Sequence, residues 1–222
     1  MKVRPGLPIL SILATGLSGI SCAEIASPSR NEVYEWRLIT GNPAGTVDTL
    51  SFHWPRSRLP VRVYTEDSLS LPAYVERGLQ SWEAAFLYGE FTAEVVADSN
   101  LADIVVRVGL PSKAGFSVGI KAAAPECEGE TELDLPEGSS EIQPPIRVYV
   151  NPRFDPSAPE VGECLALTVT HELGHAIGIF AHSPDPNDIM YSDPVVSELS
   201  VSDRATAELA YHVAPTLTIA PR

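Results

Sequence analysis

The chain has 222 residues, a length that suits one globular domain with extensions. Apolar residues make up 44% of it and charged residues 20%, which argues against a fully disordered or fibrous protein. The 20 prolines argue against the long uninterrupted helices of a bundle or coiled coil, and the formal net charge of −14 argues against binding to nucleic acid.

Residues 1–23 have the pattern of a secretory signal peptide. Two basic residues precede an apolar stretch from Leu7 to Ile20, and small residues follow it. The stretch is too short to cross a bilayer comfortably, so we expect an exported protein without a transmembrane helix in the mature chain. Two interpretations stay open: cleavage after Ala23 would release a secreted protein, whereas a bacterial lipobox ending at Cys22 would leave a lipid anchor on that cysteine.

Residues 24–58 are interpreted as a loosely structured N-terminal extension, because prolines and polar residues surround their one apolar cluster, Val33 to Ile39. Residues 59–214 form the predicted main domain, and residues 215–222 form a C-terminal tail. Within the main domain, alternation of apolar and polar residues predicts half-buried strands. The predicted strands are 59–65, 91–96, 104–108 and 146–150, with a weaker candidate at 117–121.

Three segments of the main domain have the apolar spacing of helices. We expect the first to begin with Ser70 as its cap and to end near Gly89, and the second to cover residues 163–177. The third follows Ser200, because Ser200 and Asp203 have the spacing of a capping box. The order strand, helix, strands, helix, loop, helix predicts a mixed α/β (α+β) domain.

Residues 125–145 are rich in turn-forming and acidic residues and are interpreted as a solvated loop. A calcium site in this loop stays open because calcium takes several carboxylate oxygens, although no recognised ligand spacing is present. The loop carries Cys127, which together with Cys164 remains in the domain after the leader is removed. In an oxidising compartment we expect the two cysteines to form a disulfide; the alternative is a pair of unpaired buried thiols.

The segment from His171 to His182 reads HELGHAIGIFAH and matches H-E-x-x-H-x-x-G-x-x-H at every fixed position. Residues four apart on a helix lie on one face, so His171 and His175 can bind one metal ion. Gly178 allows the helix to end and the chain to turn back, which would bring His182 to the same ion. Three neutral imidazoles leave one position of a zinc ion open to water, as in catalytic rather than structural sites.

Glu172 lies beside the two helical histidines, where a carboxylate can act as a general base. Zinc lowers the pKa of a bound water molecule, and Glu172 would accept the proton and pass it to the departing amine. The reaction predicted from these residues is hydrolysis of a peptide bond at one catalytic zinc ion.

On this motif the chain resembles the metzincin metallopeptidases, and within them the matrixin-like branch found in bacteria and animals. The segment Ile189-Met190-Tyr191 resembles the Met-turn of that family, in which the methionine lies beneath the three imidazoles and is not a ligand. Residues 102–107 are similar to the third strand of matrixins, and the likeness covers about residues 59–212. The resemblance implies a catalytic domain with a twisted five-stranded sheet and two main helices, followed by a small irregular subdomain that ends in a helix.

The resemblance also implies that a polypeptide substrate binds in extended form along an edge strand, for which residues 117–121 are the candidate. The chain departs from animal matrixins in having no cysteine-switch peptide before the domain. Only His53 and His212 remain for the second, structural zinc site of those proteins, so one zinc ion is predicted. We expect the protein to be a monomer.

Two other functions share these residues and stay open. In the first, zinc only stabilises the fold and the cleft binds a peptide without cleaving it; the presence of Glu172 argues against this function. In the second, the same chemistry cleaves amide bonds of cell-wall peptides, because the shape of the pocket wall after Met190 cannot be derived from one sequence.

Overall fold

The computed structural model describes residues 33–41, 47–111, 117–124, 127–153, 158 and 160–221. The predicted signal peptide and Cys22 lie outside these residues, so export and lipid attachment stay predictions. No helix in the described ranges combines the length and the apolar character that crossing a membrane requires.

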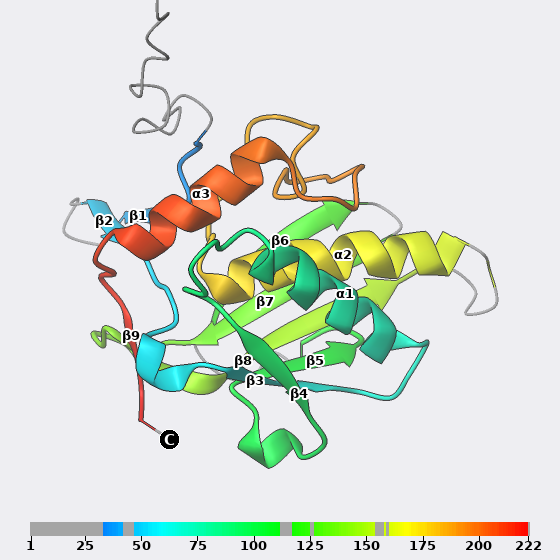
Figure 1. Cartoon of the computed structure of the whole chain (residues 1–222), viewed down its shortest axis with the longest axis horizontal. Helices are drawn as coiled ribbons and strands as arrows, with labels where there is room; N and C mark the ends of the chain where they lie inside the picture. The colour runs from blue at the N-terminus through cyan, green and yellow to red at the C-terminus, as the bar shows by residue number, and fades with distance from the viewer. Residues whose placement is uncertain are drawn as a thin grey trace, which may run out of the picture. The chain divides into compact units, whose positions relative to one another are not determined.

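Six strands form the path of one mixed sheet (Figure 1): β3 (Val61–Thr65), β4 (Ala93–Val96), β5 (Ile104–Val108), β6 (Ser117–Ala124), β7 (Cys127–Asp134) and β8 (Glu141–Pro152). Their order in the sheet is β4-β3-β5-β8-β7-β6. The first four are parallel to one another, and β7 and β6 are antiparallel additions. The predicted mixed α/β class is confirmed, with one strand more in this path than the five expected.

Three further strands are short. β1 (Leu38–Gly41) and β2 (Val47–Leu50) form a separate antiparallel hairpin. β9 (Thr218–Ile219) pairs in parallel with the start of β8, and the neighbouring Leu217 is buried. The predicted C-terminal tail therefore contributes to the packed fold.

The described part of the chain has three α-helices: α1 (Leu71–Glu83), α2 (Glu160–Ile177) and α3 (Val201–His212). α1 and α2 lie side by side across one face of the sheet (Figure 1). Alternate strand residues point toward these helices. The fully buried ones in β3, β5 and β8 are Val61, Val63, Ile104, Val106, Ile142, Ile146, Val148 and Val150. This alternation is the pattern that predicted the three strands.

The acidic segment interpreted as a solvated loop contains strand β7, so the loop interpretation is wrong. β7 pairs with both β6 and β8, and its residues Thr131 and Leu133 are buried. Glu130 and Glu132 alternate with them and so point to the other face of the sheet, where each is still only 8% exposed. Carboxylates at every second position thus belong to a strand with one apolar face.

The described part of residues 24–58 is not a loose extension, and this prediction is also wrong. Four of its aromatic side chains are buried in the main core: Tyr34, Trp36, Phe52 and Trp54. The indole of Trp54 also donates a hydrogen bond to the carbonyl of Ala176 in α2, with Nε1 and O 3.0 Å apart. The packed core therefore begins well before residue 59.

The ends of α1 differ from the prediction, whereas the start of α3 confirms it. Ser70 occupies the N-cap position of α1 with a φ of 58°, but its side chain makes no capping hydrogen bond. α1 ends at Glu83, and Gly89 lies in the following turn with a φ of 66°. At α3 the capping box is present: Ser200 Oγ accepts from Asp203 N at 3.0 Å, and Asp203 Oδ2 accepts from Ser200 N at 2.9 Å.

Candidate metal centre

The three histidines of the motif lie together, as the sequence predicts. His171 and His175 are on successive turns of α2 and fully buried, with ring centroids 4.7 Å apart. The ring of His182 lies 5.3 Å from that of His171 and 5.1 Å from that of His175. One ligand atom from each residue lies within 4.8 Å of the other two. A single metal ion fits such a cluster.

Backbone carbonyls fix the orientation of the two helical imidazoles. The Nδ1 of His171 lies 2.6 Å from the carbonyl oxygen of Ile189, and that of His175 lies 2.6 Å from the oxygen of Ile179. A carbonyl oxygen only accepts, so each Nδ1 carries the hydrogen and each neutral ring presents a lone pair at Nε2. These hydrogen bonds are the kind of outer support that metal-binding histidines receive.

The Nε2 atoms form a donor set that fits a cation. Those of His171 and His175 are only 3.0 Å apart, and with both protons on Nδ1 their lone pairs face each other. The Nε2 of His182 is buried and has no hydrogen-bond partner in the described part of the chain. Buried polar atoms left without a partner are costly, and one cation between the three nitrogens would satisfy them together.

Burial keeps the imidazoles neutral. It lowers the pKa of His171 to about 3 and the pKa of His175 well below its ordinary value. It also lowers the pKa of His182. Neutral imidazole is the form that binds a metal, so the cluster is ready to bind near neutral pH without first losing protons.

Gly178 ends α2 and starts the loop that leads to His182. Its φ is 119°, a region that disfavours residues with a Cβ atom. A Cβ atom here would also lie 2.9 Å from the carbonyl carbon of Phe52, and closer still to its oxygen. Beyond the turn, Phe180 N and Ala181 N both donate to the carbonyl of Trp36, at 2.7 and 2.9 Å. The N-terminal segment therefore holds the loop that positions His182.

Met190 is fully buried against α2. A Cβ atom at Gly174 would lie 2.7 Å from Trp82 Cζ2 and even closer to the Met190 sulfur, so the glycine before His175 makes room for this methionine. The Met190 carbonyl accepts from Ser183 N at 2.8 Å, which links its turn to the residue after His182. These contacts are compatible with the Met-turn role that the resemblance implies.

Asp203 connects the Met190 turn to α3 and to the N-terminal segment. Its Oδ2 accepts from Ile189 N at 2.9 Å, and its Oδ1 lies 3.4 Å from Met190 N. The phenol of Tyr34 donates to Oδ1 at 2.8 Å. Ile189 in turn supplies the carbonyl that orients His171, so Asp203 supports a metal-site histidine through one intervening residue. Its capping-box spacing predicts the cap but not these partners.

Glu172 is fully buried between α2 and β7. The Thr131 hydroxyl on β7 lies 2.6 Å from Glu172 Oε2 and 3.0 Å from the Glu172 backbone oxygen. Gly129 leaves room for the carboxylate, since a Cβ atom there would lie 2.7 Å from Glu172 Cγ. If residues 125–145 were a loop, there would be no reason to expect Thr131 and Gly129 beside Glu172. The alternation of acidic residues with small or apolar ones predicts a strand, and a strand places both residues on the face toward α2.

Cys127 and Cys164 form the expected disulfide, with Cα atoms 5.5 Å apart. Cys127 begins β7, and Cys164 lies near the start of α2. The bond therefore links the two elements that enclose the Glu172 side chain.

No model of a known protein family matches this chain, and no curated protein matches it either. Any function must therefore be argued from the site itself. Among the described residues, the three histidines are the one group of three or more His, Cys, Asp or Glu side chains whose ligand atoms converge. The described acidic residues between 127 and 145 form no such group, so the calcium site has no support there.

Proposed function

We propose that the protein is a zinc-dependent endopeptidase of the matrixin-like metzincin type, which its motif resembles. The observation that carries this proposal is the convergence of three neutral imidazole nitrogens within 4.8 Å. Zinc commonly takes nitrogen ligands in a tetrahedral arrangement, and three protein ligands leave one position for water or substrate. A zinc ion held in this way supplies Lewis-acid activation of water and of the scissile carbonyl.

The chain's own contribution is a carboxylate of fixed orientation. Glu172 would take a proton from the attacking water and deliver it to the nitrogen of the departing amine, so that one proton is moved and the C–N bond breaks. The Thr131 hydroxyl, 2.6 Å from Glu172 Oε2, would hold the carboxylate during both transfers. A fixed proton acceptor of this kind avoids the cost of reorienting it at the moment of reaction.

An extended polypeptide is the proposed substrate, bound along β6. That strand ends the order of the sheet, and its only strand neighbour among the described residues is β7. Strand addition at such an edge gives affinity through main-chain hydrogen bonds. An amide bond in a cell-wall peptide remains an alternative substrate, because the chemistry would be the same.

A second candidate is a non-catalytic, zinc-stabilised peptide-binding module. The complete burial of Glu172 against Thr131 favours it, because a carboxylate packed in this way also stabilises the contact between α2 and β7. Both candidates require the metal, and they differ in whether Glu172 takes part in chemistry.

The deciding experiment measures zinc per chain and cleavage of a peptide library for the purified protein and three variants. Glu172→Gln keeps the shape and an acceptor for Thr131, so it should bind one zinc ion but lose about 10²- to 10⁴-fold in hydrolysis. His175→Ala should lose zinc and activity together. The control is Glu163→Gln on the exposed side of the same helix, which should change neither.

Two results would overturn the proposal. If Glu172→Gln cleaves peptides as fast as the unmodified protein, Glu172 is not the general base. If the zinc-loaded protein binds peptides but cleaves no member of the library, the binding module is the better assignment.

A further inference from the structure

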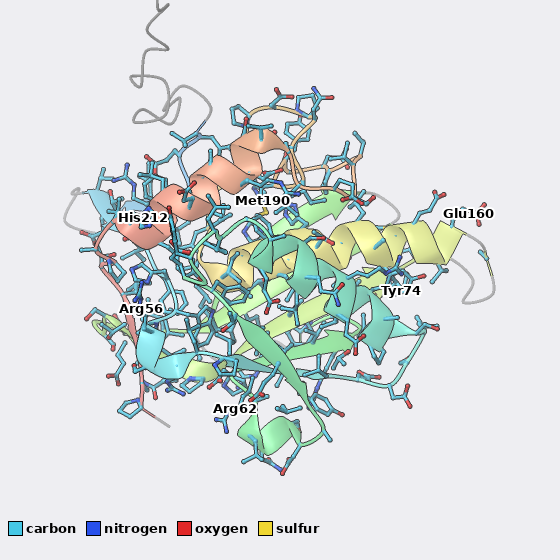
Figure 2. The ribbon with its side chains drawn as sticks, viewed as in Figure 1. Arg56, Arg62, Tyr74, Glu160, Met190 and His212 are labelled. Carbon is cyan, nitrogen blue, oxygen red and sulfur yellow. A yellow bond between two sulfur atoms is a disulfide. The ribbon has the colours of Figure 1, made fainter. Side chains whose placement is uncertain are left out.

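A concave site lies on the face of the sheet that α1 and α2 do not cover. It encloses about 760 Å³, and its rim includes the turn Ser99–Leu101 and Pro144–Pro145. Arg147 and Tyr149 reach it from β8 because they alternate with residues that are buried under the helices. None of the metal-site residues lines it, and Arg62 at its border lies well away from Met190 in Figure 2. The concavity is therefore separate from the metal centre.

Positive charge dominates the lining of this concavity. Four arginines and one carboxylate line it: Arg58, Arg62, Arg107, Arg147 and Asp103. Asp103 is buried and already paired with Arg58, whose Nη1 lies 2.9 Å from Oδ1. Its Oδ2 accepts from the backbone N of Arg62 at 2.9 Å and lies 3.5 Å from Arg62 Nε. The single carboxylate thus neutralises the buried arginine but leaves positive charge at the surface.

Arg107 and Arg147 carry the rest of this charge. Within the described residues, neither forms an ion pair with a carboxylate. On the paired strands Arg107 is opposite Tyr149 and Arg147 is opposite Val105, so the two arginines are diagonal neighbours whose like charges repel. Glu132 is opposite Arg147 on the other side, and Glu94 is opposite Arg62. Of these three arginines, Arg107 is the one whose partner on β8 is uncharged, Tyr149.

The chemistry of the lining selects an oxyanion. Guanidinium groups donate paired hydrogen bonds that match the oxygens of a carboxylate or a phosphate. Ser99 and Asn100 on the rim add neutral donors, and Val105 and Ala102 supply apolar surface. The volume falls within the range of about 300–1,000 Å³ that small-molecule sites have, so the site has room for more than a single inorganic ion.

We propose that this concavity binds a small organic anion whose phosphate or carboxylate group contacts Arg62, Arg107 and Arg147. The anion would replace the repulsion between neighbouring guanidinium groups by attraction to a shared partner. Anion binding at this site requires neither zinc nor hydrolysis, so the proposal is tested independently of the proposed function.

Calorimetric titration of the full chain with inorganic phosphate and with citrate, in a buffer of low ionic strength, tests the proposal. Low salt is needed because exposed charges are screened within about 10 Å at 0.1 M. We expect saturable binding of at least one of the two anions, and their ranking assigns the natural ligand to the phosphate or the carboxylate class. Arg107→Gln/Arg147→Gln should bind at least about tenfold more weakly, since it removes two charge-assisted contacts.

The matched control is Arg56→Gln/Arg153→Gln, which removes the same charge from two exposed positions outside the concavity. It should bind like the unmodified chain. If anion binding is weakened equally in both double variants, the anion is attracted by net charge alone and the proposal is overturned. The absence of saturable binding by the unmodified chain would overturn it as well. Backbone NMR chemical shifts of the unmodified chain test the location of the site without mutation. The anion should shift signals in β5, β8 and the Ser99–Leu101 turn; shifts that occur only elsewhere would also overturn the proposal.

Discussion

Gly129→Ala tests the arrangement of Glu172 beneath β7 directly. A Cβ atom at this position would lie 2.6 Å from Thr168 Cγ2 and 2.7 Å from Glu172 Cγ, and closer still to Glu172 Oε1. Glu172 and Thr168 are both fully buried, so neither can swing into solvent to make room. One added methyl group must therefore push α2 away from β7 or force the carboxylate into another rotamer.

The size of the effect follows from this crowding. Overpacking of a filled core costs about 1–3 kcal/mol, and each kcal/mol lowers the melting temperature of a chain of 150–250 residues by about 2–4 °C. We therefore expect Gly129→Ala to melt roughly 2–12 °C below the unmodified protein. Because the displaced group is the proposed general base, peptide hydrolysis should fall as well, whereas zinc content should stay near one ion per chain.

The control for this prediction is Gly41→Ala in β1. A Cβ atom at Gly41 meets no heavy atom within 4 Å, so the variant should be neutral or gain up to about 1 kcal/mol from the stiffer unfolded chain. Calorimetric melting and a zinc assay on both variants provide the comparison. Equal melting temperatures for the two variants would refute the placement of Glu172 against Gly129.

Other variants test the supports around the site. Tyr34→Phe removes the donor to Asp203 and should lower the free energy of unfolding by about 1–3 kcal/mol, while the exposed Tyr88→Phe should not; equal urea midpoints would contradict this. Asp103→Asn leaves the buried charge of Arg58 without its counter-charge and should lower the free energy of unfolding by about 3–5 kcal/mol in the same urea assay. A decrease below about 1 kcal/mol would argue against burial of the pair. Burial lowers the pKa of the three site imidazoles, so the unfolded chain takes up protons first as pH falls below about 6.5. Metal-free protein should therefore lose stability in that range, with a shallower pH slope when one imidazole is replaced by alanine.

Features that depend on neighbours in the sequence are predictable from it. The capping box at Ser200 and Asp203 needs only three residues and forms as expected. The pairing of His171 with His175 depends on the helical repeat alone. Even the return of His182 follows from a local cause, because Gly178 can adopt the φ of 119° that the turn requires.

Features that depend on distant partners are not predictable in this way. The sequence shows that Asp203 can cap α3, but it does not show that Tyr34, 169 residues away, donates to the same carboxylate. Likewise, Trp36 supplies the carbonyl that holds the loop before His182, although the sequence pattern around Trp36 does not predict that contact. Long-range hydrogen bonds of this kind are determined by the packed core, which periodicity does not describe.

The failure at β7 has a different cause, because the strand signal was present. From Glu128 to Asp134 an acidic residue occupies every second position, with Gly129, Thr131 and Leu133 between. Composition favours a solvated loop, whereas the period of two favours a strand, and the structure follows the period. The same strand supplies the Thr131 hydroxyl that contacts Glu172 and the space that Gly129 leaves for its carboxylate. Because the strand was not predicted, neither contact of the proposed general base was predicted. In this chain the motif locates the candidate metal ligands, but the environment that would make Glu172 reactive or inert comes from β7, whose Thr131 lies 41 residues earlier in the sequence. Gly129 is therefore the more informative position to change.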